Sequence, residues 1–83
     1  MKITMYSTTW CSDCARTKMF FQENNIEYEE IDIEKNPKAM KIVEDINNGN
    51  RSVPTVIIDK EDGKEPQIKV EPSREELNQI FEI

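Results

Sequence analysis

The sequence contains no histidine and only two cysteines, and these shortages exclude several kinds of site. Without an imidazole, neither a Cys–His nucleophilic pair nor a His-containing metal site can form within one chain. Two cysteines are also too few for the disulfide framework of a small secreted domain. What remains is one Cys11-x-x-Cys14 motif, which indicates redox or metal chemistry in a reducing compartment.

Long apolar runs and an excess of basic residues are missing too. No apolar run approaches the ~18 residues of a transmembrane helix, and Met1 to Tyr6 lacks the apolar stretch of a secretory signal. Seventeen acidic residues against eleven basic ones give a net charge of −6, without the basic footprint of a nucleic-acid-binding protein. We therefore expect a cytoplasmic protein with no nucleic-acid or membrane partner. The acidity serves solubility or favours partners with a basic docking face.

The length of 83 residues predicts one domain, 1–83, with one small core and no separate cofactor domain. Hydrophobic spacing predicts the element order β-α-β-α-β-β-α. The predicted strands are 2–7, 28–33, 55–58 and 67–70, and the predicted helices are 14–24, 37–47 and a last helix after Ser73. Asn36-Pro37 and the Ser73…Glu76 capping box are helix start signals.

The three helices each carry apolar residues at helical spacing. The side chains expected to be buried are Ala15, Met19, Phe20 and Phe21 in the first helix, Ala39, Ile42, Val43 and Ile46 in the second, and Leu77, Ile80 and Phe81 in the third. An opening β-α-β unit implies parallel strands, and the closing hairpin adds antiparallel ones. The fold class is therefore α/β, with a mixed sheet covered by helices on both faces.

Cys11 lies just past a predicted strand and at the start of a predicted helix. The first amides of a helix have no backbone partners and carry a partial positive charge, which stabilises a thiolate. Cys11 is therefore the expected attacking sulfur. Cys14, three residues on, is expected one turn inside the helix, more buried and close enough for a disulfide.

A reaction cycle follows from this pair. The Cys11 thiolate attacks a target disulfide, and Cys14 then attacks Cys11 and releases the reduced target. Alternatively, Cys11 acts alone on a mixed disulfide with a small thiol. Two further possibilities remain open: an inert packed pair, and a four-cysteine metal site shared by two chains.

Pro54 directly precedes an apolar strand, although proline cannot donate to a sheet ladder. A cis Val53-Pro54 bond would form a tight turn and offer the backbone of Val53 to an extended substrate. An ordinary trans proline at the first residue of a strand fits the residues equally well.

Three motifs together resemble the glutaredoxin family, most closely its mycoredoxin branch. They are Tyr6-Ser7-Thr8-Thr9-Trp10-Cys11-x-x-Cys14, Tyr28-Glu29-Glu30-Ile31-Asp32-Ile33 and Gly49-Asn50-Arg51-Ser52-Val53-Pro54-Thr55. The resemblance covers nearly the whole chain. It implies a thioredoxin fold with a four-stranded mixed sheet and three helices, Cys11 as nucleophile, Cys14 as resolving cysteine, and a cis Pro54.

The sequence departs from many glutathione-using glutaredoxins at three places. Thr8 stands where a lysine or arginine is common, 70–73 lacks the usual Gly-Gly pair, and Ser12-Asp13 replaces Pro-Tyr or Gly-Tyr. The expected electron source is therefore glutathione, mycothiol or another low-molecular-weight thiol, or a thioredoxin reductase. No bound cofactor and no metal is expected.

The residues predicted to contact substrate are expected to lie around Cys11 and Cys14. They are Thr9, Trp10, Ser12, Asp13, Arg51, Ser52, Val53, Pro54 and Ser73. Trp10 forms an apolar wall of the groove or is plain packing. Arg51 pairs with a substrate carboxylate or is a surface residue without a role. Ser73 helps to hold a carboxylate or simply caps the last helix, and capping is the preferred interpretation.

The predicted function is therefore that of a thiol–disulfide oxidoreductase, an enzyme reducing protein disulfides or mixed disulfides with a small thiol, as a monomer. The alternative from another class is a metal or iron–sulfur binding module using Cys11 in a dimer. A hydrogen donor for ribonucleotide reductase differs in its partner and not in its chemistry.

Overall fold

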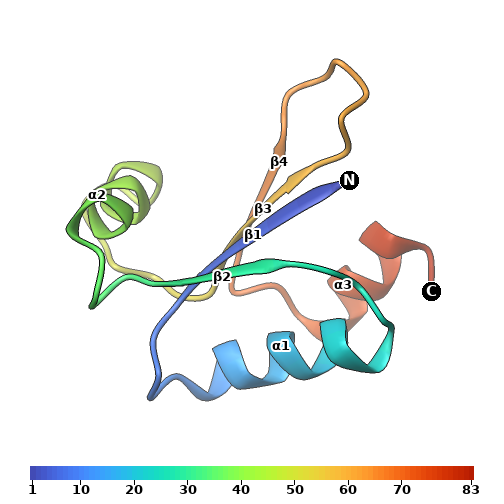
Figure 1. The fold of residues 1–83 in the computed structure, drawn as a ribbon, viewed down its shortest axis with the longest axis horizontal. Helices are drawn as coiled ribbons and strands as arrows, with labels where there is room; N and C mark the ends of the chain where they lie inside the picture. The colour runs from blue at the N-terminus through green and yellow to red at the C-terminus, as the bar shows by residue number, and fades with distance from the viewer.

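The elements follow one another in the predicted order β-α-β-α-β-β-α (Figure 1). The computed structural model describes all residues, 1–83. The elements are β1 (Lys2–Ser7), α1 (Ser12–Glu23), β2 (Glu29–Asp32), α2 (Pro37–Ile46), β3 (Thr55–Asp59), β4 (Gln67–Val70) and α3 (Arg74–Phe81). None of the helices combines the length and apolar character needed to cross a membrane.

The four strands form one mixed sheet in the order β2-β1-β3-β4. β1 pairs in parallel with β2 and antiparallel with β3, and β3 pairs antiparallel with β4. The parallel pair comes from the opening β-α-β unit, and the antiparallel pair β3-β4 comes from the hairpin at 60–66. Both predictions about the sheet are confirmed.

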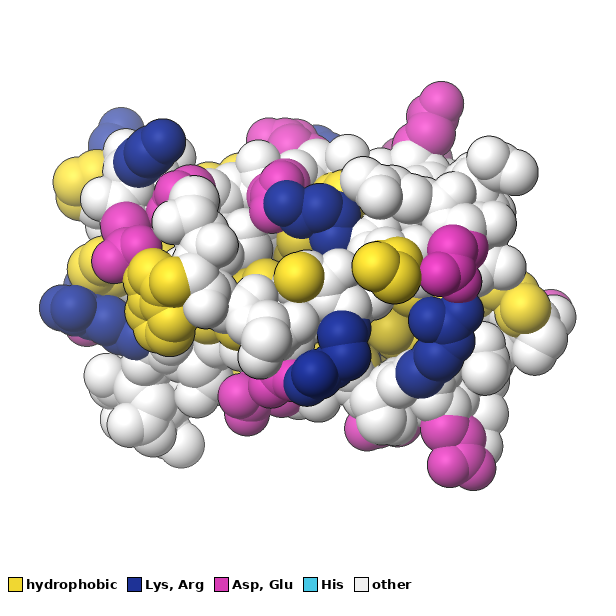
Figure 2. Space-filling view, turned by 90° about the horizontal axis from the view of Figure 1, so that it is seen from below, with side chains coloured by type: hydrophobic (Ala, Val, Ile, Leu, Met, Phe, Trp, Pro, Cys, Tyr) yellow, Lys and Arg dark blue, Asp and Glu magenta, His cyan; other side chains and the backbone are white.

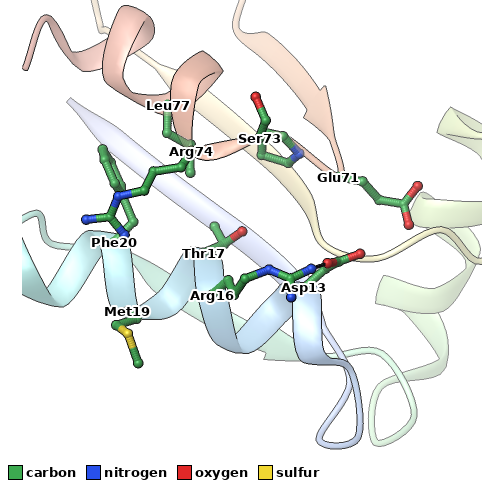
Figure 3. A pocket seen from close by; sticks show the side chains of 10 residues that line it. Asp13, Arg16, Thr17, Met19, Phe20, Glu71, Ser73, Arg74 and Leu77 are labelled. Atoms are coloured by element: carbon green, nitrogen blue, oxygen red, sulfur yellow. Dashed lines mark ion pairs between the residues drawn. The ribbon is translucent and has the colours of Figure 1, made fainter.

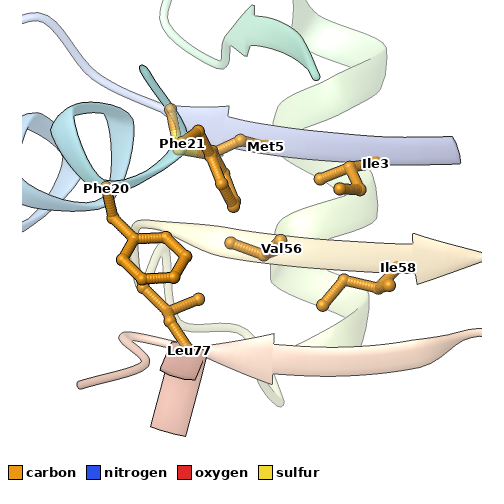
Figure 4. Packing of buried hydrophobic residues seen from close by; sticks show 7 residues of the cluster. All are labelled: Ile3, Met5, Phe20, Phe21, Val56, Ile58 and Leu77. Carbon is orange, nitrogen blue, oxygen red and sulfur yellow. The ribbon is translucent and has the colours of Figure 1, made fainter. Parts of the chain in front are cut away.

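Helices cover both faces of the sheet, with α1 and α3 on one side and α2 on the other (Figure 1). Between these two helices and the sheet lies a buried cluster that joins α1 and α3 to the central strands (Figure 4). Its members are Ile3, Met5, Phe20, Phe21, Val56, Ile58 and Leu77. A second cluster includes Ala39 and Val43 of α2 together with Cys14. The predicted helix–sheet–helix layering is confirmed.

The buried face of α1 differs from the predicted one. Ala15 is exposed and Met19 is 55% exposed, whereas Cys14 and Thr17 are buried with the two phenylalanines. Positions 14, 17 and 21 share one helix stripe, while 15 and 19 form a neighbouring stripe that faces solvent. Ile42 of α2 is likewise 41% exposed, outside the buried stripe of that helix.

Capping side chains explain where the three helices begin. α1 begins two residues earlier than predicted, because the side chain of Cys11 accepts a hydrogen bond from the N–H of Cys14 and acts as the N-cap. Asn36 caps α2 through its side chain, at 3.1 Å from the nitrogen of Ala39. The capping box of Ser73 is present at the start of α3.

Candidate redox site

Cys11 lies at the junction of β1 and α1, where the sequence predicted it. Its backbone is extended (φ −88°, ψ 117°), and its Sγ is 3.2 Å from the nitrogen of Cys14, which donates to it. The side chain is half-buried, so reagents can reach it. A sulfur in the N-cap position receives a helix amide that would otherwise be unpaired, and negative charge there is stabilised.

Cys14 lies one turn further along α1 and is only 2% exposed. Burial raises the pKa of its thiol from 9.0 to about 12, and the hydrogen bond with Cys11 acts in the same direction. A backbone hydrogen bond from Thr8 lowers the pKa of Cys14 but does not offset these effects. Both cysteines are free thiols. Cys11 is therefore the accessible sulfur, and Cys14 is the buried one whose ionisation burial disfavours.

The Val53-Pro54 peptide bond is cis, as the family resemblance implied. The Cys11 thiol donates to the carbonyl oxygen of Val53 at 3.7 Å, which brings the loop against the redox pair. The loop is held by two bonds, Thr55 Oγ1 to the oxygen of Ser52 at 2.7 Å and the nitrogen of Glu71 to the oxygen of Pro54 at 2.8 Å.

A hollow of about 340 Å³ opens beside Cys11. It brings together most of the residues predicted to contact substrate, namely Trp10, Ser12, Asp13, Arg51, Ser52 and Val53, and adds Glu71, which sequence reasoning missed. Glu71 reaches the site because the turn after β4, where its φ is +50°, passes next to the cis-proline loop.

The other three predicted residues lie outside this hollow. Thr9 lines a separate hollow on the β2 side of the pair. Pro54 is fully buried and acts as part of the loop. Ser73 lines a different groove, and its hydroxyl is engaged by the nitrogen of Glu76 at 3.1 Å, so capping is its observed role.

Trp10, Arg51 and Asp13 are each held by a charged neighbour. Trp10 is 72% exposed, so plain core packing is wrong for it, and its indole N–H donates to Glu34 at 2.9 Å. Arg51 donates to Glu44 at 3.1 Å. Asp13 forms an ion pair with Arg16 one turn along α1, so a cation adjoins the acidic residue between the two cysteines.

A larger groove of about 540 Å³ runs between α1 and the start of α3 (Figure 3). Asp13 and Glu71 line both this groove and the hollow beside Cys11, so the two are neighbours. Arg74 lies 5.5 Å above the ring of Phe20 in this groove. Viewed from below, the molecule shows small hydrophobic patches between dark blue and magenta side chains (Figure 2).

A smaller hollow of about 240 Å³ lies on the β2 side of the cysteines and includes residues that sequence reasoning missed. Its charged and hydroxyl-bearing members, besides Thr9, are Ser7, Thr8, Lys18, Glu30 and Asp32. Lys18 lies four residues after Cys14, which was a usable signal. Glu30 comes from another element, and only the register of β1 and β2 places it here.

An α/β fold of this topology with a Cys-x-x-Cys motif at a strand–helix junction is the thioredoxin-like architecture. Two solved structures share it: the thioredoxin-like protein BC3987 (TM-score 0.76, 32% identity, 95% of this chain and 99% of that one) and NrdH-redoxin from Escherichia coli (TM-score 0.63, 28% identity, 72% and 76%). The family model described as Glutaredoxin matches residues 3–62. The chain belongs to the glutaredoxin family.

Two relatives show similarity along part of the chain. The Mycobacterium tuberculosis protein named "Putative glutaredoxin Rv3198A" is 48% identical over 54 residues, covering 65% of this chain and 64% of that protein. Mycoredoxin 1 of Corynebacterium glutamicum is 37% identical over 54 residues, covering 65% and 66%. The chain therefore matches just under two thirds of the length of these relatives.

Proposed function

We propose that the protein is a thiol–disulfide oxidoreductase with Cys11 as nucleophile and Cys14 as resolving cysteine. The Cys11 thiolate attacks one sulfur of a substrate disulfide, which forms a mixed disulfide and releases the other sulfur as a thiolate. Cys14 then attacks the Cys11 sulfur, and the substrate leaves reduced while the Cys11–Cys14 disulfide forms. An outside thiol or a reductase returns the pair to the dithiol.

The observation that carries this proposal is the unequal placement of the two sulfurs. Cys11 is reachable and receives the N–H of Cys14, whereas Cys14 is 2% exposed and its pKa is raised to about 12. A reachable sulfur at a helix N-terminus suits the first attack on an outside disulfide. A buried thiol beside it can react only with the mixed disulfide that the first attack forms at Cys11.

The substrates we propose are protein disulfides and mixed disulfides of a low-molecular-weight thiol. The backbone of Val53 faces the Cys11 sulfur and supports docking of an extended segment by main-chain hydrogen bonds. A segment docked on the backbone of Val53 would have Trp10 and Arg51 at its sides, since both line the hollow beside Cys11.

We propose that the electron source is either a thioredoxin reductase or a small thiol other than glutathione. Thr8 and the segment 70–73 lack the features common in glutathione-using relatives. Similarity to mycoredoxin 1 supports mycothiol, and similarity to NrdH-redoxin, which is described as having a thioredoxin-like activity profile, supports a reductase. Oxidised protein offered each reductant with its own NADPH-linked system would identify the donor by NADPH consumption.

Variants of the two cysteines test the mechanism. Cys11→Ser should abolish the reduction of every disulfide, because the attacking sulfur is gone. Cys14→Ser should lose activity on protein disulfides but retain it on a small-thiol mixed disulfide, which Cys11 alone can process. Full activity of Cys11→Ser would refute the assignment of the nucleophile. Purification without oxygen should give a colourless monomer, and a coloured dimer would favour the iron–sulfur alternative instead.

A further inference from the structure

An ion pair lies beside Cys14, on the side of the cysteines away from Val53. The Nζ of Lys18 is 2.9 Å from the Oε2 of Glu30, and the same oxygen accepts a hydrogen bond from Ser7 Oγ at 2.9 Å. Lys18 follows Cys14 by one turn of α1, and Glu30 comes from β2. Both charged side chains line the hollow of about 240 Å³ that both cysteines also line.

This hollow gives the buried thiol of Cys14 a polar route to solvent. Thr8 also lines it, and its Oγ1 is buried without a hydrogen-bond partner in the protein. A polar cavity of this size accommodates water, which satisfies such atoms and can carry a proton. Asp32 lines the same hollow, so it is the remaining charged group that faces this water.

From their charges, the two members of the pair are expected to act on the Cys14 thiol in opposite directions. The Glu30 carboxylate contributes to the raised pKa of Cys14, after burial and the bond with Cys11. The hydrogen bond to Glu30 raises the pKa of Lys18, with smaller contributions from Tyr28 and Cys14, so Lys18 stays cationic near neutral pH. A cation one turn away favours the thiolate of Cys14, and an anion disfavours it.

We propose that the Lys18–Glu30 pair sets the rate at which Cys14 resolves a mixed disulfide on Cys11, with Lys18 accelerating that step and Glu30 slowing it. This inference rests on the proposed redox function. In the step, the Cys14 thiol gives its proton to water in the hollow, and the thiolate attacks the Cys11 sulfur. The bond from Cys11 to the substrate sulfur breaks, and the substrate leaves reduced and takes up a proton while the cysteine pair is oxidised.

The rate of this step decides which of two routes a mixed disulfide follows. Slow resolution leaves time for a second small thiol to attack the mixed disulfide, so that Cys11 works alone. Fast resolution forms the Cys11–Cys14 disulfide and releases the reduced substrate before an outside thiol arrives. The charge balance between Lys18 and Glu30 therefore sets the preference between small-thiol and protein substrates.

Stopped-flow reaction of the reduced protein with dithiobis(nitrobenzoate) separates the steps, since each releases one coloured nitrothiobenzoate. The first release follows attack by Cys11 and depends on reagent concentration, whereas the second is intramolecular and follows attack by Cys14. Near neutral pH, Glu30→Gln should raise the second rate about threefold and Lys18→Gln should lower it about threefold. One pKa unit changes the thiolate fraction tenfold, and the accompanying change in nucleophilicity cancels about half of that on a logarithmic scale.

The pH dependence of the second rate distinguishes charge from structure. The apparent pKa of the second phase should fall in Glu30→Gln and rise in Lys18→Gln, and the double variant should return towards the wild-type value. Glu29→Gln and Lys38→Gln are matched controls, because they make the same charge changes at exposed sites outside the hollow.

Several results would overturn the proposal. If both variants slow the second phase, the pair only braces α1 against β2. If the first phase changes as much as the second, the pair acts on Cys11. An unchanged second phase, or equal effects in the control variants, would also refute it. A protein that releases no nitrothiobenzoate at all would instead refute the proposed redox function.

Discussion

At the scale of single residues, two identical side chains acquire different properties from their positions in one turn of helix. Cys11 precedes the first helical residue and accepts a hydrogen bond from one helix amide, whereas Cys14 is buried in a cluster with Ala39 and Val43. The spacing of three residues allows both environments to occur within reach of one disulfide. The difference in reactivity is therefore a property of place and not of residue type.

The raised pKa of Cys14 predicts a dependence of stability on pH. The pKa is 9.0 for the ordinary thiol and about 12 in the fold, so the folded state favours the neutral form. This contribution is fully present below pH 9 and is lost as the pH rises from 9 towards 12. Urea midpoints measured under reducing conditions should fall more steeply over this range in the wild type than in Cys14→Ala, where nothing titrates at that site. Parallel curves would contradict the prediction.

At the scale of elements, helix caps place the functional loops. The side chain of Ser73 accepts from the nitrogen of Glu76, and the nitrogen of Ser73 donates to the Glu76 carboxylate at 3.2 Å. Only Pro72 separates this cap from Glu71, whose nitrogen bonds to the cis-proline loop. A well-formed cap therefore fixes one side of the hollow beside Cys11.

Ser73→Ala should destabilise the protein by about 1 kcal/mol, because one helix amide loses its partner. In a chain of this length the melting temperature should fall by about 5 °C. Gln79→Ala, an exposed change in the same helix, is the control and should leave the melting temperature nearly unchanged. Reduction of a small mixed disulfide should be preserved in both variants below their melting temperatures. An unchanged melting temperature in Ser73→Ala would show that water replaces the cap without cost.

At the scale of the whole molecule, the net charge of −6 acts on every encounter with a charged substrate. The charges are interspersed on the face seen from below, so no single strong patch dominates that view (Figure 2). The long-range effect therefore follows the net charge, and ions in solution screen it.

The rate of each reagent with the protein is divided by its rate with a free thiol of low charge. By this ratio, cystamine, a dication, should react faster than dithiobis(nitrobenzoate), a dianion. The advantage should shrink several-fold as salt rises from about 0.01 M to about 1 M, because the Debye length falls from about 30 Å to about 3 Å. Uncharged hydroxyethyl disulfide is the control and should show little salt dependence. An advantage that salt does not alter would place the discrimination in direct contacts, such as Glu71 and Arg51 in the hollow.

The sequence by itself determined the order of the elements, the mixed sheet and the position of Cys11, because hydrophobic periodicity and cap residues act over a few neighbouring positions. Asn36-Pro37, Ser73…Glu76 and the β-branched run at 55–58 each specify structure locally. The same local signals did not fix which stripe of α1 faces inward, so Ala15 and Met19 were assigned to the core wrongly.

Only the tertiary structure decided what surrounds the two sulfurs. Glu71 comes to Cys11 from the turn after the edge strand β4, and Glu30 comes to Lys18 through the pairing of β1 with β2. These contacts depend on strand order, register and side-chain direction, which are set by the packing of the whole chain and not by the spacing of neighbours. Likewise, Ser73 became a cap outside the substrate hollow because α3 packs against α1 rather than over the cysteines.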